Sequence, residues 1–272
     1  MQLYRGFDVG TAKIPKAERA AIEHHLIDIL NPDEIFSAGD YARAATESIA
    51  AISGRGRLPI VVGGTGFYLR ALLEGLPDLP GRDDAVRARI IRRDRRLHRL
   101  LQRLDPGAAA RIHERDAQKL IRALEIRILT GKPTPAREPR IALRGHTIRV
   151  LGLNPDREAL YEVLDARTQE MFRPRLSKPN LLDEVAALLA AGCTGSEKPF
   201  ESLGYKQALA HLQGTTTLDE AIASTQLETR QYAKRQWTWF RRERDIVWLD
   251  GFGDSQEILE KARDLIASSM LP

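Results

Sequence analysis

The chain has 272 residues, of which 43% are hydrophobic and 29% charged, and its formal net charge is +5. This length suffices for one large α/β domain, with or without a smaller subdomain. No apolar run reaches the roughly 18 residues of a membrane span, the first residues do not resemble a signal peptide, and Cys193 is the only cysteine. The sequence therefore excludes a membrane-spanning helix, an internal disulfide and a cysteine-rich metal site. It predicts a cytoplasmic protein.

The first third of the chain mixes loops with short elements. Residues 2–15 contain two glycines and no clear periodicity, which indicates a loop whose backbone lies near a ligand, or a plain surface loop. Residues 23–29 alternate weakly and predict a short strand. Adjacent histidines on a strand point to opposite faces, so we interpret His24 and His25 as structural rather than metal-binding. Ser37 begins a helix that runs to about Ser53.

Residues 58–75 are predicted to be the strand, turn and helix around which the fold is organised. The apolar run at residues 60–62 is typical of a strand buried on both faces, and residues 67–73 form an amphipathic helix pattern. The glycine-rich turn between them directs backbone N–H groups and a helix dipole at one spot, where Thr65 caps the helix or touches a ligand. An ordinary tight βα connection is the alternative, because Gly-Gly-Thr-Gly is not a full phosphate-binding signature.

The composition changes near residue 81. Arginines crowd a helical pattern over residues 83–103, and the Asp-Pro-Gly at residues 105–107 is predicted to end that helix. Another helix covers about residues 117–129 and ends at a Thr-Gly-Lys-Pro stop. We therefore predict a helical subdomain at residues 81–142. Its basic face is either an ordinary solvated surface or a surface that touches phosphates.

The rest of the chain is predicted as one buried strand followed by helices. The strand covers residues 146–153, and the helices cover residues 157–172 and 181–191, a short segment opened by residues 202–206, and residues 218–243. On the last helix Arg230, Lys234 and Arg241 align along one strip, opposite Tyr232 and other aromatic residues that we interpret as core anchors. The strip is denser than solubility requires and indicates an anionic substrate or a nucleic-acid backbone.

Six segments, taken in order, resemble the tRNA dimethylallyltransferases. They are YRGFDVGTAK at 4–13, HHLID at 24–28, VGGTGFY at 62–68, IRALE at 121–125, GYK at 204–206 and TRQYAKRQWTWF at 229–240. Each segment alone is weak, but the ordered set is specific and covers nearly the whole chain. The resemblance implies an α/β fold with a P-loop NTPase-like parallel sheet core. It assigns residues 1–80 to a truncated core, 81–142 to a helical tRNA-contacting subdomain, and 143–272 to the rest of the core and the C-terminal helices.

The resemblance also implies the reaction. Members of this family transfer a dimethylallyl group from dimethylallyl diphosphate to N6 of the adenine at position 37 of tRNA, next to the anticodon. The adenine must leave the base stack to be modified. The implied partners are the tRNA anticodon stem-loop and dimethylallyl diphosphate, with Mg²⁺ as cofactor and no membrane, and the implied state is a monomer.

Site residues follow by matching positions. Thr65 resembles the family's channel threonine near both substrates, and Arg167 resembles an arginine that faces the diphosphate, where we expect it to clamp the leaving group. Lys119 stands where an arginine is usual, which keeps the charge but loses the bidentate fork. The positions that match tRNA contacts are Met1, Gln2, Thr65, Arg87, Gln118, Lys119, Leu120, Ile121, Arg122, Glu201, Ser202, Leu203, Gly204, Tyr205 and Lys206.

One departure from the family pattern concerns the start of the chain. The family begins with a strand, a Gly-x-x-x-x-Gly-Lys-Thr/Ser loop, a helix and a second strand, which these 272 residues do not contain. Met1 and Gln2 match the end of an Asp-Ser-Met-Gln motif, so the proton-accepting aspartate is expected just before residue 1. We therefore expect a fragment or a misplaced start. The alternatives are a catalytically incomplete RNA-binding fragment and an adenylate prenyltransferase, although a mononucleotide needs no basic subdomain.

Overall fold

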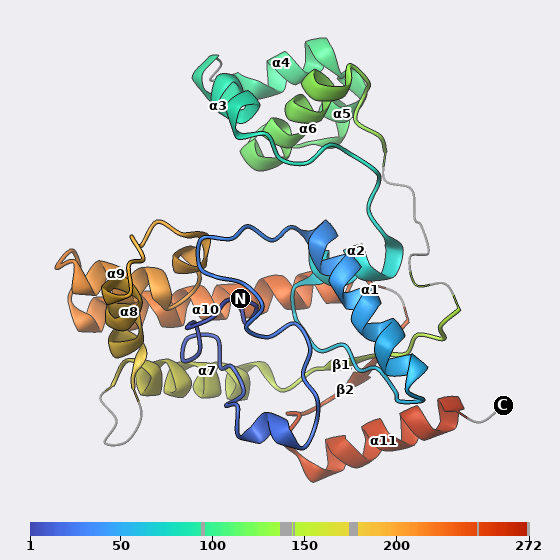
Figure 1. Ribbon diagram of the computed structural model, residues 1–272, viewed down its shortest axis with the longest axis vertical. Coiled ribbons are helices and arrows are strands. Elements are labelled where there is room, and N and C mark those ends of the chain that lie inside the picture. The colour runs from blue at the N-terminus through green and yellow to red at the C-terminus, as the bar shows by residue number, and fades with distance from the viewer. Residues whose placement is uncertain (94–95, 137–142, 144, 174–178, 244, 271–272) are drawn as a thin grey trace. The chain divides into compact units, whose positions relative to one another are not determined.

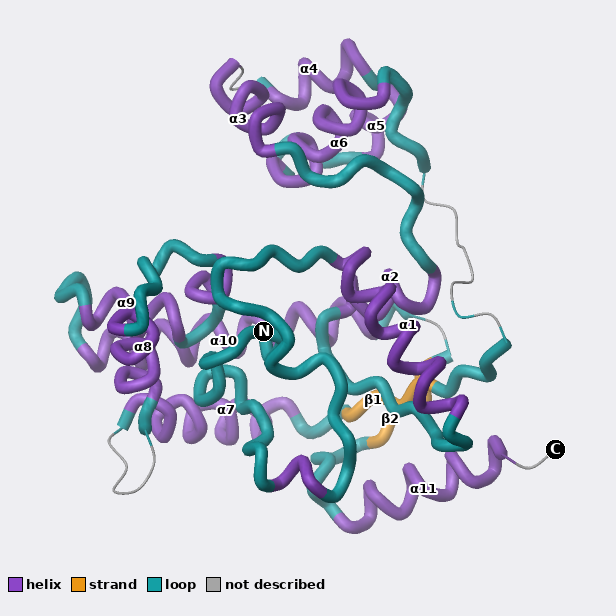
Figure 2. Tube along the Cα trace, in the orientation of Figure 1, coloured by secondary structure: helices purple, strands orange, loops and turns teal. Residues whose placement is uncertain are grey.

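The computed structural model describes residues 1–93, 96–136, 143, 145–173, 179–243 and 245–270 (Figure 1). The chain forms two compact units. Unit 1 comprises Met1–Leu72 and Leu143–Pro272, and unit 2 comprises Leu73–Ala142. The end that we predicted for the subdomain, residue 142, lies outside the described residues. The described part of unit 2 contains helices and loops, whereas unit 1 also contains a sheet (Figure 2).

The sheet of unit 1 is a parallel pair. β1 (Val150–Leu153) lies beside β2 (Ile246–Leu249), with Val150 opposite Ile246 and Leu153 opposite Leu249. With the surrounding helices, this pair gives the predicted α/β class. β1 covers only the second half of the predicted strand at residues 146–153. β2 was not predicted, because four residues are too short for a periodicity to stand out.

Two predicted strands are wrong. The chain is irregular over residues 58–65, and Ile60 and Val62 are 71% and 88% exposed. A buried parallel strand exists only where neighbours pair its N–H and C=O groups, and in the described residues the two strands pair only with each other. Residues 23–29 are also irregular, and the nearest pairing is an isolated bridge between Tyr4 and Leu30.

Helices make up most of unit 1, and the predicted helices are confirmed with shifts at their ends. Ser37, Asn180 and Thr217 each cap a helix through a capping box. The helices and 3₁₀ turns are η1 (Glu18–Ala20), α1 (Ala38–Gly54), α2 (Gly66–Glu74), α7 (Arg157–Phe172), α8 (Leu181–Ala190), η2 (Lys198–Glu201), α9 (Tyr205–Leu212), α10 (Leu218–Phe240) and α11 (Gln256–Met270).

The core of unit 1 joins the N-terminal loop to α7, α8, α9 and α10. Phe7, Phe172 and Tyr205 are completely buried in it, and Phe200 nearly so. The Phe7 ring lies 5.2 Å from the Phe200 ring and 4.8 Å from the Tyr205 ring, measured between centroids. These aromatic contacts hold an irregular loop against helices that come more than a hundred and fifty residues later.

Unit 2 has its own apolar core. It contains α3 (Asp84–Arg93), α4 (Leu97–Leu104), α5 (Pro106–Arg111) and α6 (Ala117–Thr130), and Leu101, Leu120 and Leu124 are buried between them. The single helix predicted at residues 83–103 is therefore two helices. Asp105 also does more than end one of them: its side chain accepts from the Ala108 N–H at 3.0 Å and starts α5, with Pro106 at the first position.

Asp105 provides a test of this packing. Its second carboxylate oxygen accepts from the Thr134 N–H at 2.6 Å, so one buried side chain joins α5 to the segment after α6. We expect Asp105→Ala to lower the free energy of unfolding by about 1–2 kcal/mol at pH 7, through loss of the helix cap. Urea unfolding followed by circular dichroism measures this difference.

Burial alone would raise the pKa of Asp105, but hydrogen bonds from Thr134 and Ala108 outweigh it and lower the pKa. The stabilisation is therefore complete above the ordinary pKa of about 4 and is lost as the pH falls through the lowered folded-state value. Asp84→Ala is the control, because its side chain is 67% exposed, and we expect a change within about 0.5 kcal/mol. Equal effects of the two variants would contradict the role of Asp105.

Candidate functional site

The turn that carries Thr65 is held by the C-terminal half of α10. Gln236 Nε2 donates to the Gly64 carbonyl at 2.9 Å, and a Cβ on Gly66 would lie 2.1 Å from Trp239 Nε1. The Thr65 carbonyl accepts the first N–H groups of α2. The backbone on both sides of Thr65 is thus fixed, while its side chain is exposed.

α2 and α10 are held together by further contacts next to this turn. The Arg70 guanidinium lies 4.3 Å from the centroid of the Trp239 ring and forms an ion pair with Glu243. On the other side of α2, the Tyr68 ring packs on Tyr41 of α1 at 5.2 Å between centroids. The turn is therefore supported from two helices.

Arg167 lies on α7, which is also attached to α10. Arg230 Nη1 donates to Asp165 Oδ2 at 2.6 Å, and Gln226 Nε2 donates to the Asp165 carbonyl at 3.2 Å. The Arg167 side chain is exposed and forms no ion pair with any described residue. Desolvation by the surrounding protein lowers its pKa, yet an arginine remains charged in proteins. Such an unpaired, partly desolvated cation suits an anionic ligand.

Exposed cations continue along the end of α10. Lys234, Arg235, Arg241 and Arg242 are exposed, and none of them pairs with a carboxylate in the described part of the chain. Arg230, which the sequence placed in the same strip, is instead paired with Asp165. The remaining four form what we call the basic strip, and their unneutralised charge suits a polyanion.

Tyr232 is not the core anchor that we predicted. It is 37% exposed, and the Arg235 guanidinium lies 5.7 Å from its ring centroid. A helix only partly covered by its neighbours leaves one aromatic face to solvent, which periodicity cannot reveal.

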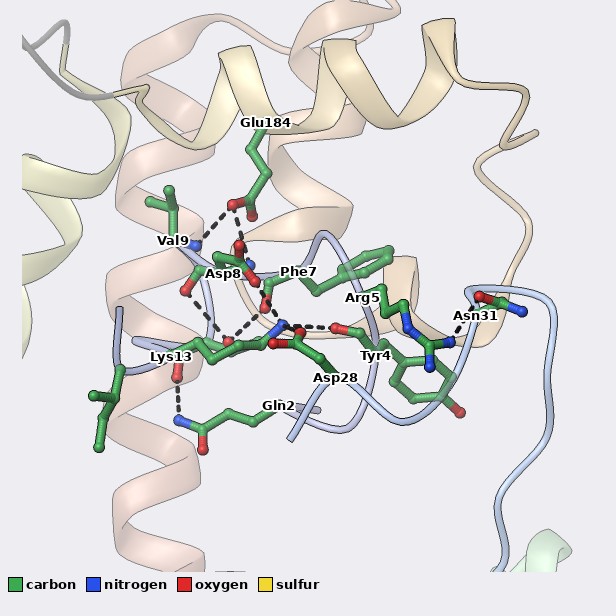
Figure 3. A network of polar contacts seen from close by, with 12 residues as sticks. Gln2, Tyr4, Arg5, Phe7, Asp8, Val9, Lys13, Asp28, Asn31 and Glu184 are labelled. Atoms are coloured by element: carbon green, nitrogen blue, oxygen red, sulfur yellow. Dashed lines mark hydrogen bonds and ion pairs between the residues drawn. The ribbon is translucent and has the colours of Figure 1, made fainter. Parts of the chain in front are cut away.

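Met1 and Gln2, the two N-terminal residues, also lie in unit 1. Met1 is 45% exposed, and Gln2 is half-buried with its side-chain amide donating to the Thr11 carbonyl at 3.0 Å (Figure 3). The loop that carries them is held by Lys13 and Glu184, which were not singled out from the sequence. Their roles arise from contacts between different segments and have no local signature.

The segment at residues 201–206 leads into α9. Glu201 and Lys206 are exposed and form ion pairs with Lys198 and Glu228, while Ser202 and Leu203 are half-buried. Gly204 and Tyr205 are buried, and the Tyr205 hydroxyl donates to Glu184 Oε1 at 2.5 Å. The surface of this segment is thus formed by its two ends.

In unit 2, one buried carboxylate holds two of the expected tRNA contacts. Glu125 is completely buried and accepts from Arg87 Nε and Nη2 at 2.9 Å each, from Arg122 Nη1 at 2.7 Å and from the Asp83 N–H at 2.7 Å. Burial would raise the pKa of Glu125, but the hydrogen bonds of the two arginines outweigh it and lower the pKa to about 2. Arg122 also donates to the Pro80 carbonyl at 2.7 Å.

The neighbouring positions on α6 divide between surface and core. Gln118 and Lys119 are exposed, with Lys119 Nζ 2.7 Å from Asp116, whereas Leu120 is buried in the core of unit 2 and Ile121 is half-buried. The side chains of this segment that can reach a ligand are therefore Gln118, Lys119 and Arg122.

Comparison with known proteins identifies the family. Residues 2–243 match the family model described as IPP transferase. The chain belongs to this family. It is 54% identical over 273 residues to the tRNA dimethylallyltransferase of Solibacter usitatus, an alignment that covers 98% of this chain and 87% of the relative. It is 46% identical to that of Koribacter versatilis, with the same coverage.

Solved structures agree with this membership. The full-length tRNA isopentenylpyrophosphate transferase of Bacillus halodurans aligns with a TM-score of 0.68 at 36% identity, covering 98% of this chain and 84% of that one. A eukaryotic dimethylallyltransferase acting on tRNA aligns with a TM-score of 0.78 at 26% identity, covering 99% and 70%. The predicted family and the predicted fold class are thus confirmed.

The described residues contain no group of three or more His, Cys, Asp or Glu side chains that could hold a metal ion. Within those residues no helix is long and apolar enough to cross a membrane.

We expect Glu125→Ala to unfold or loosen unit 2, because it leaves Arg87 and Arg122 partly buried without their shared counter-charge. Breaking a buried pair typically costs about 3–5 kcal/mol. Hydrogen exchange of the α6 amides at pH 7 measures this loss within the unit. The difference in stability between the wild type and Glu125→Ala becomes smaller as the pH falls from the ordinary glutamate pKa of about 4.3 toward 2, because the wild type loses the same negative charge over that range. Glu114→Ala, at an exposed position in the same unit, is the control and leaves the exchange unchanged.

Proposed function

We propose that this protein transfers a dimethylallyl group from dimethylallyl diphosphate to N6 of the adenine at position 37, 3′ to the anticodon, in tRNA. The observation that carries the proposal is membership of the IPP transferase family over residues 2–243. Two relatives at 54% and 46% identity are named tRNA dimethylallyltransferases.

In the proposed step, the N6 amine attacks C1 of the dimethylallyl group. The N6–C1 bond forms, the C1–O bond breaks, and the diphosphate leaves with the electron pair. Arg167 stabilises the negative charge that grows on the diphosphate, which fits its unpaired and partly desolvated guanidinium. Thr65 contributes an exposed hydroxyl on a fixed turn between the two substrates. The amine proton passes to a general base, a role that suits a carboxylate close to the amine.

The tRNA anticodon stem-loop is the proposed partner. The basic strip at the C-terminal end of α10 offers four cations without carboxylate partners to its phosphates, and unit 2 offers Arg87, Lys119 and Arg122. The target adenine is extruded from the stack to reach the site. The proposal includes a monomer that acts in the cytoplasm.

Mg²⁺ is expected from the resemblance, where it assists departure of the diphosphate as a Lewis acid. Mg²⁺ usually takes only one or two protein ligands, and the oxygens of the diphosphate would supply others.

The proposal is tested by expressing the gene product in a bacterium that lacks its own tRNA dimethylallyltransferase. Mass spectrometry of digested tRNA should then detect N6-(dimethylallyl)adenosine. Binding of tRNA without this product would indicate an RNA-binding fragment instead. Prenylation of free adenylate but not of tRNA would indicate an adenylate prenyltransferase.

We expect Arg167→Ala to lower the single-turnover rate by about 100-fold, as for removal of one donor to a developing charge. Its affinity for tRNA should change little. Rapid-quench kinetics with saturating tRNA measures the rate. Arg157→Ala is the control on the same helix, because Arg157 stacks on Tyr161 at 5.2 Å, and it should leave the rate unchanged. An unchanged rate in Arg167→Ala would rule out the clamp.

We expect Arg241→Ala to weaken tRNA binding and to reduce the slope of log K against log salt by about 1, because one phosphate contact and its counterions are lost. Fluorescence titrations at several salt concentrations measure the slope. Arg43 of α1 is exposed but already paired with Asp40, so Arg43→Ala is the matched control. Identical slopes for wild type and Arg241→Ala would show that the basic strip does not contact phosphate.

A further inference from the structure

The N-terminal loop is irregular, but its backbone is tightly constrained. Ala12, Leu26 and Asp28 adopt φ values of +48°, +59° and +57°, a region that side-chain-bearing residues rarely occupy. Three of the four described non-glycine residues with positive φ thus lie in one stretch. Such conformations persist where surrounding contacts fix them, and they gather at binding sites.

Lys13 provides the central contact of this loop. Its side chain is 1% exposed, and its ammonium donates to the Tyr4 carbonyl at 2.7 Å, to Asp8 Oδ1 at 2.5 Å and to Asp28 Oδ1 at 2.6 Å (Figure 3). A lysine has three N–H donors, so each one has an acceptor. Arg19 donates to the other oxygen of Asp28 at 2.9 Å, and two cations thus balance two carboxylates.

A second, partly buried contact fixes the opposite side of the loop. Glu184 Oε2 of α8 accepts from the Asp8 and Val9 N–H groups at 3.1 and 2.8 Å, as Figure 3 shows. Tyr205 donates to the other oxygen of Glu184 and accepts from the Gly10 N–H at 3.2 Å. The loop is therefore held between Lys13 inside it and the α8–α9 pair outside it.

Gln2 is attached to the residues that Lys13 orders. The Gln2 carbonyl accepts from the Asp28 N–H at 3.1 Å, and its side-chain Nε2 donates to the Thr11 and Ala12 carbonyls at 3.0 and 3.3 Å. Both contacts of Gln2 are next to Lys13: Asp28 forms an ion pair with Lys13, and Thr11 and Ala12 directly precede it in the chain. No described residue donates to Gln2 Oε1, which remains an acceptor in a fixed position.

We propose that Lys13 is a positioning residue for RNA recognition, holding Gln2 so that its Oε1 accepts a hydrogen bond from an N–H or O–H group of bound tRNA. The inference rests on the proposed function, because it requires tRNA as the ligand. It adds a residue that touches no substrate and acts only through Gln2.

A double-mutant cycle in tRNA affinity tests the inference with this chain and unmodified tRNA. We expect Lys13→Met and Gln2→Ala each to lower the affinity at least tenfold, with the number of tRNA molecules bound per chain unchanged. In the Gln2→Ala background, Lys13→Met should cause no further loss, because both remove the same contact. A merely structural role would reduce the number of competent molecules and leave their affinity unchanged.

Arg5→Ala is the matched control. Arg5 is a cation in the same loop, but it donates to Asn31 at 2.9 Å on the exposed side, and its removal should leave the affinity unchanged. If circular dichroism shows that Lys13→Met is unfolded, Asp28→Asn replaces it in the cycle with the same expectation. Equal losses in the wild-type and Gln2→Ala backgrounds, or an unchanged affinity, overturn the inference. A wild-type chain that binds no tRNA overturns the proposed function itself.

Discussion

The packing of α10 against the Gly64–Gly66 turn is the contact on which the rest of the site depends. Gln236 bonds the turn and Trp239 lies where any side chain on Gly66 would be, so the helix and the turn fix each other. The same helix holds α7 through Arg230 and Asp165. Thr65 and Arg167 are thus positioned by one long element, which itself is held at its other end by the core of unit 1.

In both units a buried charged side chain holds the surrounding segments in place. Lys13 organises an irregular loop through two carboxylates, and Glu125 organises unit 2 through two arginines. In each case the buried ion is surrounded by opposite charges and by backbone groups, so its desolvation is offset locally. The result is a rigid placement of groups that the family resemblance assigns to tRNA, without regular secondary structure in the first case.

The helices were largely predictable, because caps and periodicity are local. Ser37, Asn180 and Thr217 begin their helices where the sequence indicates, and Gly131 ends α6 in a left-handed conformation. The strand predicted at residues 60–62 is wrong because a strand depends on contacts that are not local. An apolar run forms a strand only where neighbouring strands pair with it. We interpreted Asp105 as the end of a helix, but Asp-Pro-Gly can both end one helix and begin the next. Only the contact of Asp105 with Ala108 shows that it also begins α5.

The sequence by itself determined most of the helices, the family and the residue types of the site, because each is encoded in short motifs and their order. It could not separate exposed from buried members within a motif: Leu120 and Tyr205 lie in cores, while Lys119 and Lys206 reach the surface. It also gave no sign of Lys13, Glu125, Glu184 and Gln236 as supports. Their roles arise from contacts between segments distant in the chain, and only the tertiary structure brings those partners within hydrogen-bonding distance.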